Sequence, residues 1–265
     1  MRRLALVLLI ALVASPAFLA PAQSPMARAE LVAEYAAIVP GQPFDVALRI
    51  VMEKDVHTYW RNPGDSGMPT TLDWRLPPGF EAGPLQWPLP VKFFFEGFAS
   101  FGYSGELLLP VRIEAPASLR PGMSIRLTAR ADWLGCTDIC VPEGADLSLI
   151  LPVRESPGDP TPWAAIFEQT RRRLPRDAEG WRLGMTPSEG RHVTLRVQPP
   201  DGVSLEGTPL YFYPYDGGLI EAGGEQVATH QGGAVAMRLP VSTFRMTPVN
   251  ALKGILVVGE GQADA

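Results

Sequence analysis

The sequence predicts an all-β protein, in which an immunoglobulin-like antiparallel β-sandwich is followed by a second, smaller β domain with one helix. Glycine and proline, 26 and 28 of the 265 residues, exceed their average combined usage of about 12%, and they divide the chain into short segments. Apolar and polar side chains alternate along several of these segments, which is the period of a half-buried strand. A hydrophobic content of 46% against 19% charged residues supplies a sizeable core.

The strands expected in the first domain, residues 30–154, follow this alternation. In residues 44–52 every second side chain is apolar, namely Phe44, Val46, Leu48, Ile50 and Met52. The pattern returns at residues 125–131 and 147–153. Residues 107–113 are another expected strand, at an edge or a bulge because Pro110 interrupts it. Pro-Gly pairs mark turns between the runs, at residues 40–41, 63–64, 78–79 and 121–122. Short strands separated by turns in this way favour an antiparallel sandwich.

Residues 155–160 are polar and rich in proline and glycine, so we expect them to link the two domains. After this linker, Thr161 is expected to cap a helix whose first position is Pro162. Apolar side chains then recur at helical spacing, at Trp163, Ile166, Phe167 and Leu174. Further strands are expected within the second domain, residues 161–262, at residues 193–197, 211–213, 235–239 and 255–258.

The first 29 residues have the features of a secretory signal peptide. Met1-Arg2-Arg3 precedes an apolar run, residues 4–13, that is too short to span a bilayer. Ala27-Arg28-Ala29 fits the small-x-small rule for cleavage, and Ala20-Pro21-Ala22 fits it less well. An uncleaved membrane anchor is the alternative. We therefore expect cleavage near Ala29 and a soluble, exported mature protein.

Charge and motif content exclude several function classes. The formal net charge is −5, and removal of residues 1–29, which carry three arginines and no acidic residue, would make it −8. A nucleic-acid partner is therefore not expected, and the scattered lysines form no patch for anionic lipids. The sequence contains no Gly-x-Ser-x-Gly, no His-Glu-x-x-His, no phosphate-binding glycine loop and no dinucleotide fingerprint. Hydrolase and nucleotide-dependent functions consequently have no support.

The two cysteines, Cys136 and Cys140, lie on the connection between two expected strands. Five residues at a tight turn can bring two Cβ atoms within disulfide distance if the loop folds back on itself. A disulfide across so short a loop constrains the unfolded chain little. Three interpretations stay open: a structural role as an inert clip or as two buried free thiols, a redox pair, or part of a metal site. Because a metal would need further ligands and the three histidines are far apart in sequence, no metal and no cofactor is expected.

Two aromatic-rich segments, residues 56–69 and 87–103, could cover a site. The first contains His57, which we interpret as a structural histidine. The second holds five phenylalanines in nine residues, Phe93, Phe94, Phe95, Phe98 and Phe101. One strand cannot bury so many rings on one face, so part of this surface should cover something or meet a partner. An ordinary core strand remains the alternative for residues 93–95.

At these motifs the sequence resembles the N-terminal periplasmic domain of the thiol:disulfide interchange proteins DsbD, and more closely the ScsB-type branch. The resemblance covers roughly residues 31–262 and includes residues 57–64 (HTYWRNPG), 102–111 (GYSGELLLPV), 133–143 (WLGCTDICVPE) and 211–214 (YFYP). It implies a sandwich whose cysteine pair accepts electrons from a membrane partner and passes them to thioredoxin-fold oxidoreductases. Cys140 would exchange with these partners, and Cys136 would resolve the mixed disulfide.

The resemblance also implies a cap loop whose phenylalanine shields the cysteine pair. Phe98 is the best match by position, and Phe95, Phe101 and Tyr103 are the other candidate shielding residues. Proteins of this family continue into a transmembrane domain and a thioredoxin-like domain, whereas this chain stops at Ala265. We therefore expect a separate membrane protein as the electron donor. The family is associated with cytochrome c biogenesis, and its ScsB-type branch with copper tolerance.

The sequence thus predicts an exported, monomeric thiol-disulfide exchange module, which as an enzyme would be a protein-disulfide reductase component. Asp132, Asp138 and Glu143 flank the cysteines and are expected to raise the thiol pKa, because a nearby carboxylate disfavours a thiolate. Displacement of the cap by a partner would release the reactivity. Two alternatives remain: a non-catalytic binding or chaperone module with a structural disulfide, and a copper-tolerance protein that binds Cu(I).

Overall fold

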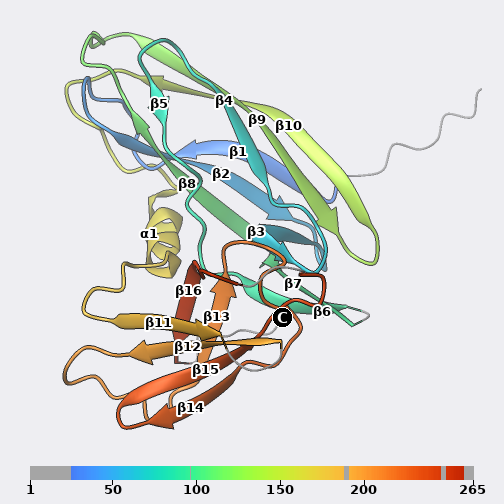
Figure 1. The fold of residues 1–265 in the computed structure, drawn as a ribbon. Helices are drawn as coiled ribbons and strands as arrows, with labels where there is room; N and C mark the ends of the chain where they lie inside the picture. The colour runs from blue at the N-terminus through green and yellow to red at the C-terminus, as the bar shows by residue number, and fades with distance from the viewer. Residues whose placement is uncertain (1–24, 96, 188–190, 246–248, 260–265) are drawn as a thin grey trace, which may run out of the picture.

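The computed structural model describes residues 25–95, 97–187, 191–245 and 249–259, and it shows a long β-sandwich with a smaller β unit beside it (Figure 1). The strands of the sandwich are β1 (Ala27–Ala33), β2 (Phe44–Met52), β3 (His57–Gly64), β4 (Thr71–Arg75), β5 (Glu81–Ala82), β6 (Val91–Phe95), β7 (Phe98–Ser104), β8 (Glu106–Glu114), β9 (Ser124–Cys136) and β10 (Cys140–Pro152). The helix is α1 (Ala164–Arg173). The second unit contains β11 (Arg182–Pro187), β12 (His192–Gln198), β13 (Leu210–Pro214), β14 (Val227–Gln231), β15 (Ala234–Pro240) and β16 (Gly254–Val258).

Two antiparallel sheets form the sandwich. One has the strand order β1-β2-β8-β5, and the other has the order β10-β9-β3-β7-β6 with β4 also paired to β9. The alternation predicted for residues 44–52 is that of β2, in which Val46, Leu48 and Ile50 are fully buried. Their side chains share one face because successive residues of a strand point to opposite sides of the sheet. The predicted all-β sandwich is confirmed.

The second unit has a core of its own and also completes the core of the sandwich. Its four-stranded sheet, β11-β12-β15-β14, packs around Met237 and Leu239. Its two-stranded sheet, β13-β16, directs the fully buried Tyr213 at the sandwich. There the Tyr213 ring centroid lies 6.1 Å from that of Trp60 and 5.1 Å from that of Phe101. The two units therefore meet through packed aromatic rings as well as through the connecting chain.

Helix α1 differs from the prediction in its start and in its packing. The helix begins at Ala164 and its N-cap position is Trp163, so the predicted cap at Thr161 is wrong. The Thr161 hydroxyl instead donates to the carbonyl of Ala33 at 2.6 Å. The same hydroxyl accepts a hydrogen bond from the backbone N–H of Trp163 at 3.2 Å. Phe167 then buries the apolar face of α1 against side chains of β1, β2 and β8. The helix consequently covers the sandwich. The sequence pattern instead predicts it in the second domain.

The expected linker, residues 155–160, is likewise tied to the sandwich. The backbone N–H of Ala36 donates to the carbonyl of Asp159 at 3.1 Å, and that of Ala37 to the carbonyl of Pro157 at 2.9 Å. Tyr35 and Pro160 also form a β-bridge. These bonds attach the segment to the chain that follows β1. We therefore place the boundary between the two units after α1 and not at residues 155–160.

The sandwich begins before the expected cleavage point. Residues 1–24, which make up most of the expected signal peptide, lie outside the described residues. Ala27 and Ala29 pair with Met52 and Ile50 of β2, so cleavage after Ala29 would remove three paired residues of β1. The first domain accordingly starts no later than Ala27, and not at residue 30 as predicted. In the described ranges, no helix is long and apolar enough to cross a membrane.

Candidate functional site

The two cysteines face each other at the tip of the long β9–β10 hairpin. Cys136 ends β9, Cys140 begins β10, and the two residues are directly opposite in register with a Cα–Cα distance of 4.1 Å. Their sulfur atoms form a disulfide bond. The three connecting residues turn back so tightly that the N–H of Thr137 donates to the carbonyl of Ile139 at 3.3 Å. The expected folding back of this loop is therefore confirmed.

The two halves of the disulfide have different environments. Cys136 is 0% exposed and packs with Tyr59 and Leu134, whereas Cys140 is exposed. Ile139, next to Cys140, is 72% exposed. A reactant arriving from solvent therefore meets Cys140, because Cys136 is closed off by the sheet.

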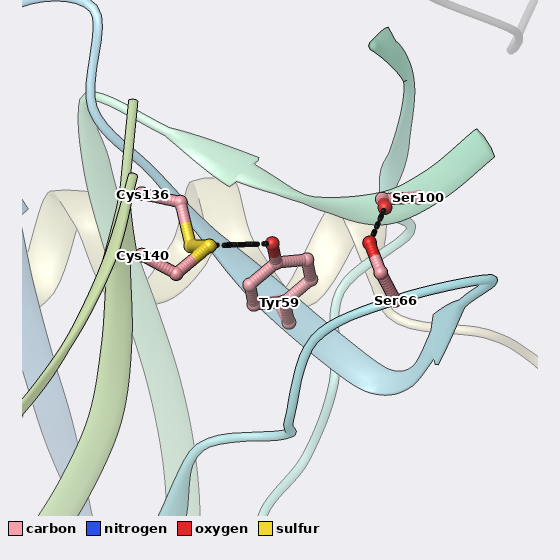
Figure 2. The surroundings of a disulfide bond; sticks show 5 residues. All are labelled: Tyr59, Ser66, Ser100, Cys136 and Cys140. Atoms are coloured by element: carbon pink, nitrogen blue, oxygen red, sulfur yellow. Dashed lines mark hydrogen bonds between the residues drawn. A yellow bond between two sulfur atoms is a disulfide. The ribbon is translucent and has the colours of Figure 1, made fainter. Parts of the chain in front are cut away.

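The hydroxyl of Tyr59 points at both sulfur atoms (Figure 2). Its oxygen lies 3.2 Å from Sγ of Cys136 and 3.3 Å from Sγ of Cys140, and since a disulfide has no proton, the hydroxyl is the donor. Burial raises the pKa of Tyr59, although a hydrogen bond with Ser66 acts in the opposite direction. Tyr59 is therefore a protonated donor held against the disulfide.

The Tyr59 ring packs directly against the backbone of Gly67. Gly67 has φ +106°, and an added Cβ there would overlap the ring of Tyr59. Only a residue without a side chain lets the loop after β3 lie this close to the ring at such a φ value. In the same loop, Oγ of Ser66 lies 3.3 Å from Oγ of Ser100 in β7, and Figure 2 shows this contact.

His57 lies beside the disulfide, although the sequence marked it only as a structural histidine. It is the residue of β3 that pairs with Cys136 of β9, so the two side chains project from the same face of the sheet. The His57 ring stacks on Phe93 with centroids 4.9 Å apart, and it meets the edge of Tyr59 at 5.5 Å. Burial lowers the pKa of His57. The one signal in the sequence was the spacing of His57 and Tyr59, which places both on one face of a strand.

The expected shielding residues are divided between two faces of β7. Phe101 and Tyr103 are 1% and 4% exposed and lie in the main core, and the Tyr103 hydroxyl donates to the carbonyl of Pro88 at 2.7 Å. These two residues cannot form a cap, and their prediction as shielding residues is wrong. Phe98 is 57% exposed, and the side chain of Phe95 lies outside the described residues. The aromatic ring that contacts the site is instead that of Phe93, through its stacking on His57.

Two of the three carboxylates expected to raise the thiol pKa are engaged elsewhere. Asp132 forms a salt bridge with Arg130 at 2.8 Å. Glu143 accepts hydrogen bonds from the indole of Trp133 and from the backbone N–H groups of residues 26 and 27. Glu143 pairs with Trp133, which lies three residues before Cys136 in β9. Because side chains alternate along a strand, the Glu143 side chain projects from the face of the hairpin opposite to that of Cys136. Asp138 alone lies in the connection between the cysteines.

Metal-ligating groups are not gathered at the hairpin or elsewhere in the described ranges. There, no three or more histidine, cysteine, aspartate or glutamate side chains lie together in a way that could hold a metal ion. At the hairpin tip, the structure places the Tyr59 hydroxyl and the His57 ring beside the disulfide.

A β-sandwich that carries a disulfide at the tip of a hairpin, with one cysteine buried and the other exposed, is typical of a thiol-disulfide interchange module. Residues 27–152 match the family model described as "Thiol:disulfide interchange protein DsbD, N-terminal". This part of the chain is therefore similar in sequence to that family, as the resemblance of its motifs implied.

Solved structures extend the similarity over the second unit. The N-terminal periplasmic domain of ScsB from Proteus mirabilis has 17% sequence identity and a TM-score of 0.63, covering 93% of this chain and 94% of that domain. The two chains therefore share their overall fold. The YadV chaperone (12% identity, 87% and 98% coverage, TM-score 0.23) and Spo0M from Bacillus subtilis (12% identity, 89% and 91% coverage, TM-score 0.22) are too dissimilar to support any argument. No curated protein matches the sequence significantly.

Proposed function

We propose that this protein is a periplasmic relay module, which takes electrons from a separate membrane donor and passes them to thioredoxin-fold oxidoreductases through Cys140. The observation that carries the proposal is the asymmetry of the disulfide, with Cys136 0% exposed and Cys140 open to solvent. Exchange proceeds by attack of a thiolate on the accessible sulfur. The similarity of residues 27–152 to the DsbD N-terminal family supports the choice of partners.

Reduction of the module balances as two successive exchanges. A thiolate of the donor attacks Sγ of Cys140, a bond forms between these two sulfurs, and the bond between Cys140 and Cys136 breaks with its electron pair left on Cys136. The second thiolate of the donor then attacks the donor sulfur of this mixed disulfide and releases Cys140 as a thiolate. The donor dithiol is oxidised to a disulfide and the module gains two electrons. In the forward step, Cys140 attacks the partner disulfide and Cys136 resolves the mixed disulfide.

Tyr59 supports the step in which Cys136 leaves. The leaving thiolate is created in a buried position, where an uncompensated charge is costly. The Tyr59 hydroxyl already lies 3.2 Å from this sulfur, and hydrogen bonds to an ionised acceptor are stronger than neutral ones. A raised pKa keeps this hydroxyl protonated, so it remains a donor when the thiolate forms.

A trapping experiment tests the assignment of Cys140. The full chain with Cys136→Ala is mixed with a thioredoxin-fold protein that keeps only its attacking cysteine, activated as a mixed disulfide with thionitrobenzoate. Attack by the Cys140 thiolate releases thionitrobenzoate, which is followed by its absorbance, and leaves a covalent adduct. We expect rapid adduct formation for Cys136→Ala and at least tenfold slower release for the matched Cys140→Ala variant, because Cys136 is buried.

Equal rates for the two single variants, or no adduct with either, would overturn the exchange role. In that case the disulfide would be a structural clip, and Cys136→Ser/Cys140→Ser would retain function at reduced stability. The redox state of the pair in the export compartment gives an independent measure, because an exchange module becomes more oxidised when the membrane donor is lost.

A further inference from the structure

The hairpin of β6 and β7 has two faces with different neighbours. Phe93 pairs with Ser100, and Gly102, two residues further along β7, pairs with Tyr59 of β3. Cross-strand partners and residues two apart share a face, so Phe93 projects on the same side as Tyr59 and stacks on His57 there. Lys92 and Phe94, the flanking residues in β6, project on the opposite side. One face of the hairpin therefore meets the disulfide site.

The opposite face of the hairpin rests on the second unit. Nζ of Lys92 lies 5.0 Å from the ring centroid of Tyr211 in β13 and 4.6 Å from that of Phe94. Lys92 is 9% exposed, so its ammonium group is held at this junction and not in solvent. The turn at Gly223 also reaches the hairpin, because a Cβ built there would lie 3.5 Å from Cβ of Ala99. The second unit thus contacts both strands of the hairpin.

We propose that Lys92 and Tyr211 are positioning residues for the exchange reaction. By attaching the β6–β7 hairpin to the second unit, they keep Phe93 stacked on His57 beside Cys136, and so they keep reductants away from this buried half of the disulfide. The inference rests on the proposed function and deepens it, since it assigns the second unit a part in controlling that site. Loosening of the hairpin would then open the buried Cys136 to attack as well as the exposed Cys140.

The rate at which dithiothreitol reduces the disulfide in the full chain tests this role. Lys92→Met removes the cation but keeps the length of the side chain, and Tyr211→Leu removes the ring. We expect each variant to be reduced at least threefold faster than the wild type. The matched control is Lys54→Met, whose side chain is exposed between β2 and β3 and should leave the rate unchanged. Lys92→Arg keeps a cation over the ring and should retain the wild-type rate.

A double-mutant cycle separates positioning from a general loss of stability. If Lys92 acts through Phe93, then adding Lys92→Met to Phe93→Ala should leave the reduction rate at the value of Phe93→Ala alone. The inference would be overturned if Lys92→Met raised the reduction rate by the same factor in the wild type and in Phe93→Ala. A wild-type rate for Lys92→Met alone would also overturn it. Failure of the proposed function is recognised separately. In that case the wild type would not exchange with a thioredoxin-fold partner, while the dithiothreitol rates would still show the coupling between Lys92 and Phe93.

Discussion

At the scale of single residues, the site depends on a hydroxyl that serves two sulfur atoms. Tyr59 is buried, carries a raised pKa, and lies 3.2 and 3.3 Å from the sulfurs of the disulfide. In the oxidised protein each of these bonds is weak, because sulfur is a weak acceptor. Once a thiolate forms on Cys136, the same geometry becomes a charge-assisted hydrogen bond. The interaction therefore strengthens along the reaction.

Tyr59→Phe should slow reduction of the disulfide by about 10- to 100-fold, because a hydrogen bond to a charged group contributes about 1.5–3 kcal/mol. The rate is measured with dithiothreitol under pseudo-first-order conditions. Tyr103→Phe is the matched control, since it also removes a buried hydroxyl, one that bonds to the carbonyl of Pro88 and to neither sulfur. If the two variants are slowed equally, the contact of Tyr59 with the sulfurs contributes nothing to the rate.

At the scale of elements, the loop after β3 determines where the Tyr59 ring lies. Two glycines in the sandwich with positive φ differ in their surroundings. Gly67, at φ +106°, would place a Cβ in the ring of Tyr59, whereas Gly122, at φ +93°, has nothing within 4 Å of an added Cβ. Substitution at either position imposes the backbone cost of a positive φ, and only the substitution at Gly67 also displaces the ring.

Gly67→Ala should therefore both destabilise the protein and slow the exchange reaction. The backbone cost, about 1–2 kcal/mol, should be common to Gly122→Ala and can be read from denaturant unfolding of the two variants. The reduction rate should fall for Gly67→Ala in the direction expected for Tyr59→Phe, and it should stay at the wild-type value for Gly122→Ala. A wild-type rate for Gly67→Ala would show that the loop does not position Tyr59.

At the scale of the whole molecule, the two units share a packed aromatic junction. Tyr213 of the second unit packs against Trp60 and Phe101 of the sandwich. The side-chain amide of Asn62 donates a hydrogen bond to the carbonyl of Pro214 at 2.8 Å across the same junction. Because Trp60 and Tyr59 are adjacent in β3, packing at this junction also supports the strand that carries the site.

Tyr213→Ala should lower the unfolding free energy of both units by about 3–5 kcal/mol, the usual cost of truncating a large buried aromatic side chain. Hydrogen exchange followed by mass spectrometry would then show reduced protection in β9 of the sandwich and in β15 of the second unit. Phe244→Ala serves as the control, because that ring is 90% exposed and its loss should change neither. Loss of protection confined to β15 would contradict a shared core.

Local patterns in the sequence were sufficient for the fold class and for part of the site. The alternation in residues 44–52 predicted β2, because period-two burial needs no knowledge of which strand lies opposite. The five-residue spacing of Cys136 and Cys140 allowed the disulfide that closes the β9–β10 hairpin. The same alternation could not reveal that Phe101 and Tyr103 face the core while Phe93 faces the site, since both faces of the β6–β7 hairpin carry aromatic residues.

By itself, then, the sequence determined the strands with clear alternation, such as β2, β9 and β10, and the pair of cysteines between two of them, all of which depend on neighbours within a few residues. The tertiary structure alone decided that Tyr59, 77 residues from Cys136 in the chain, donates to its sulfur, and that His57 pairs with it across the sheet. It also decided that α1 covers the sandwich and that the second unit holds the β6–β7 hairpin. The physical reason is register. Strands that are distant in sequence are aligned by packing of the whole core, and no single segment of the sequence specifies that alignment.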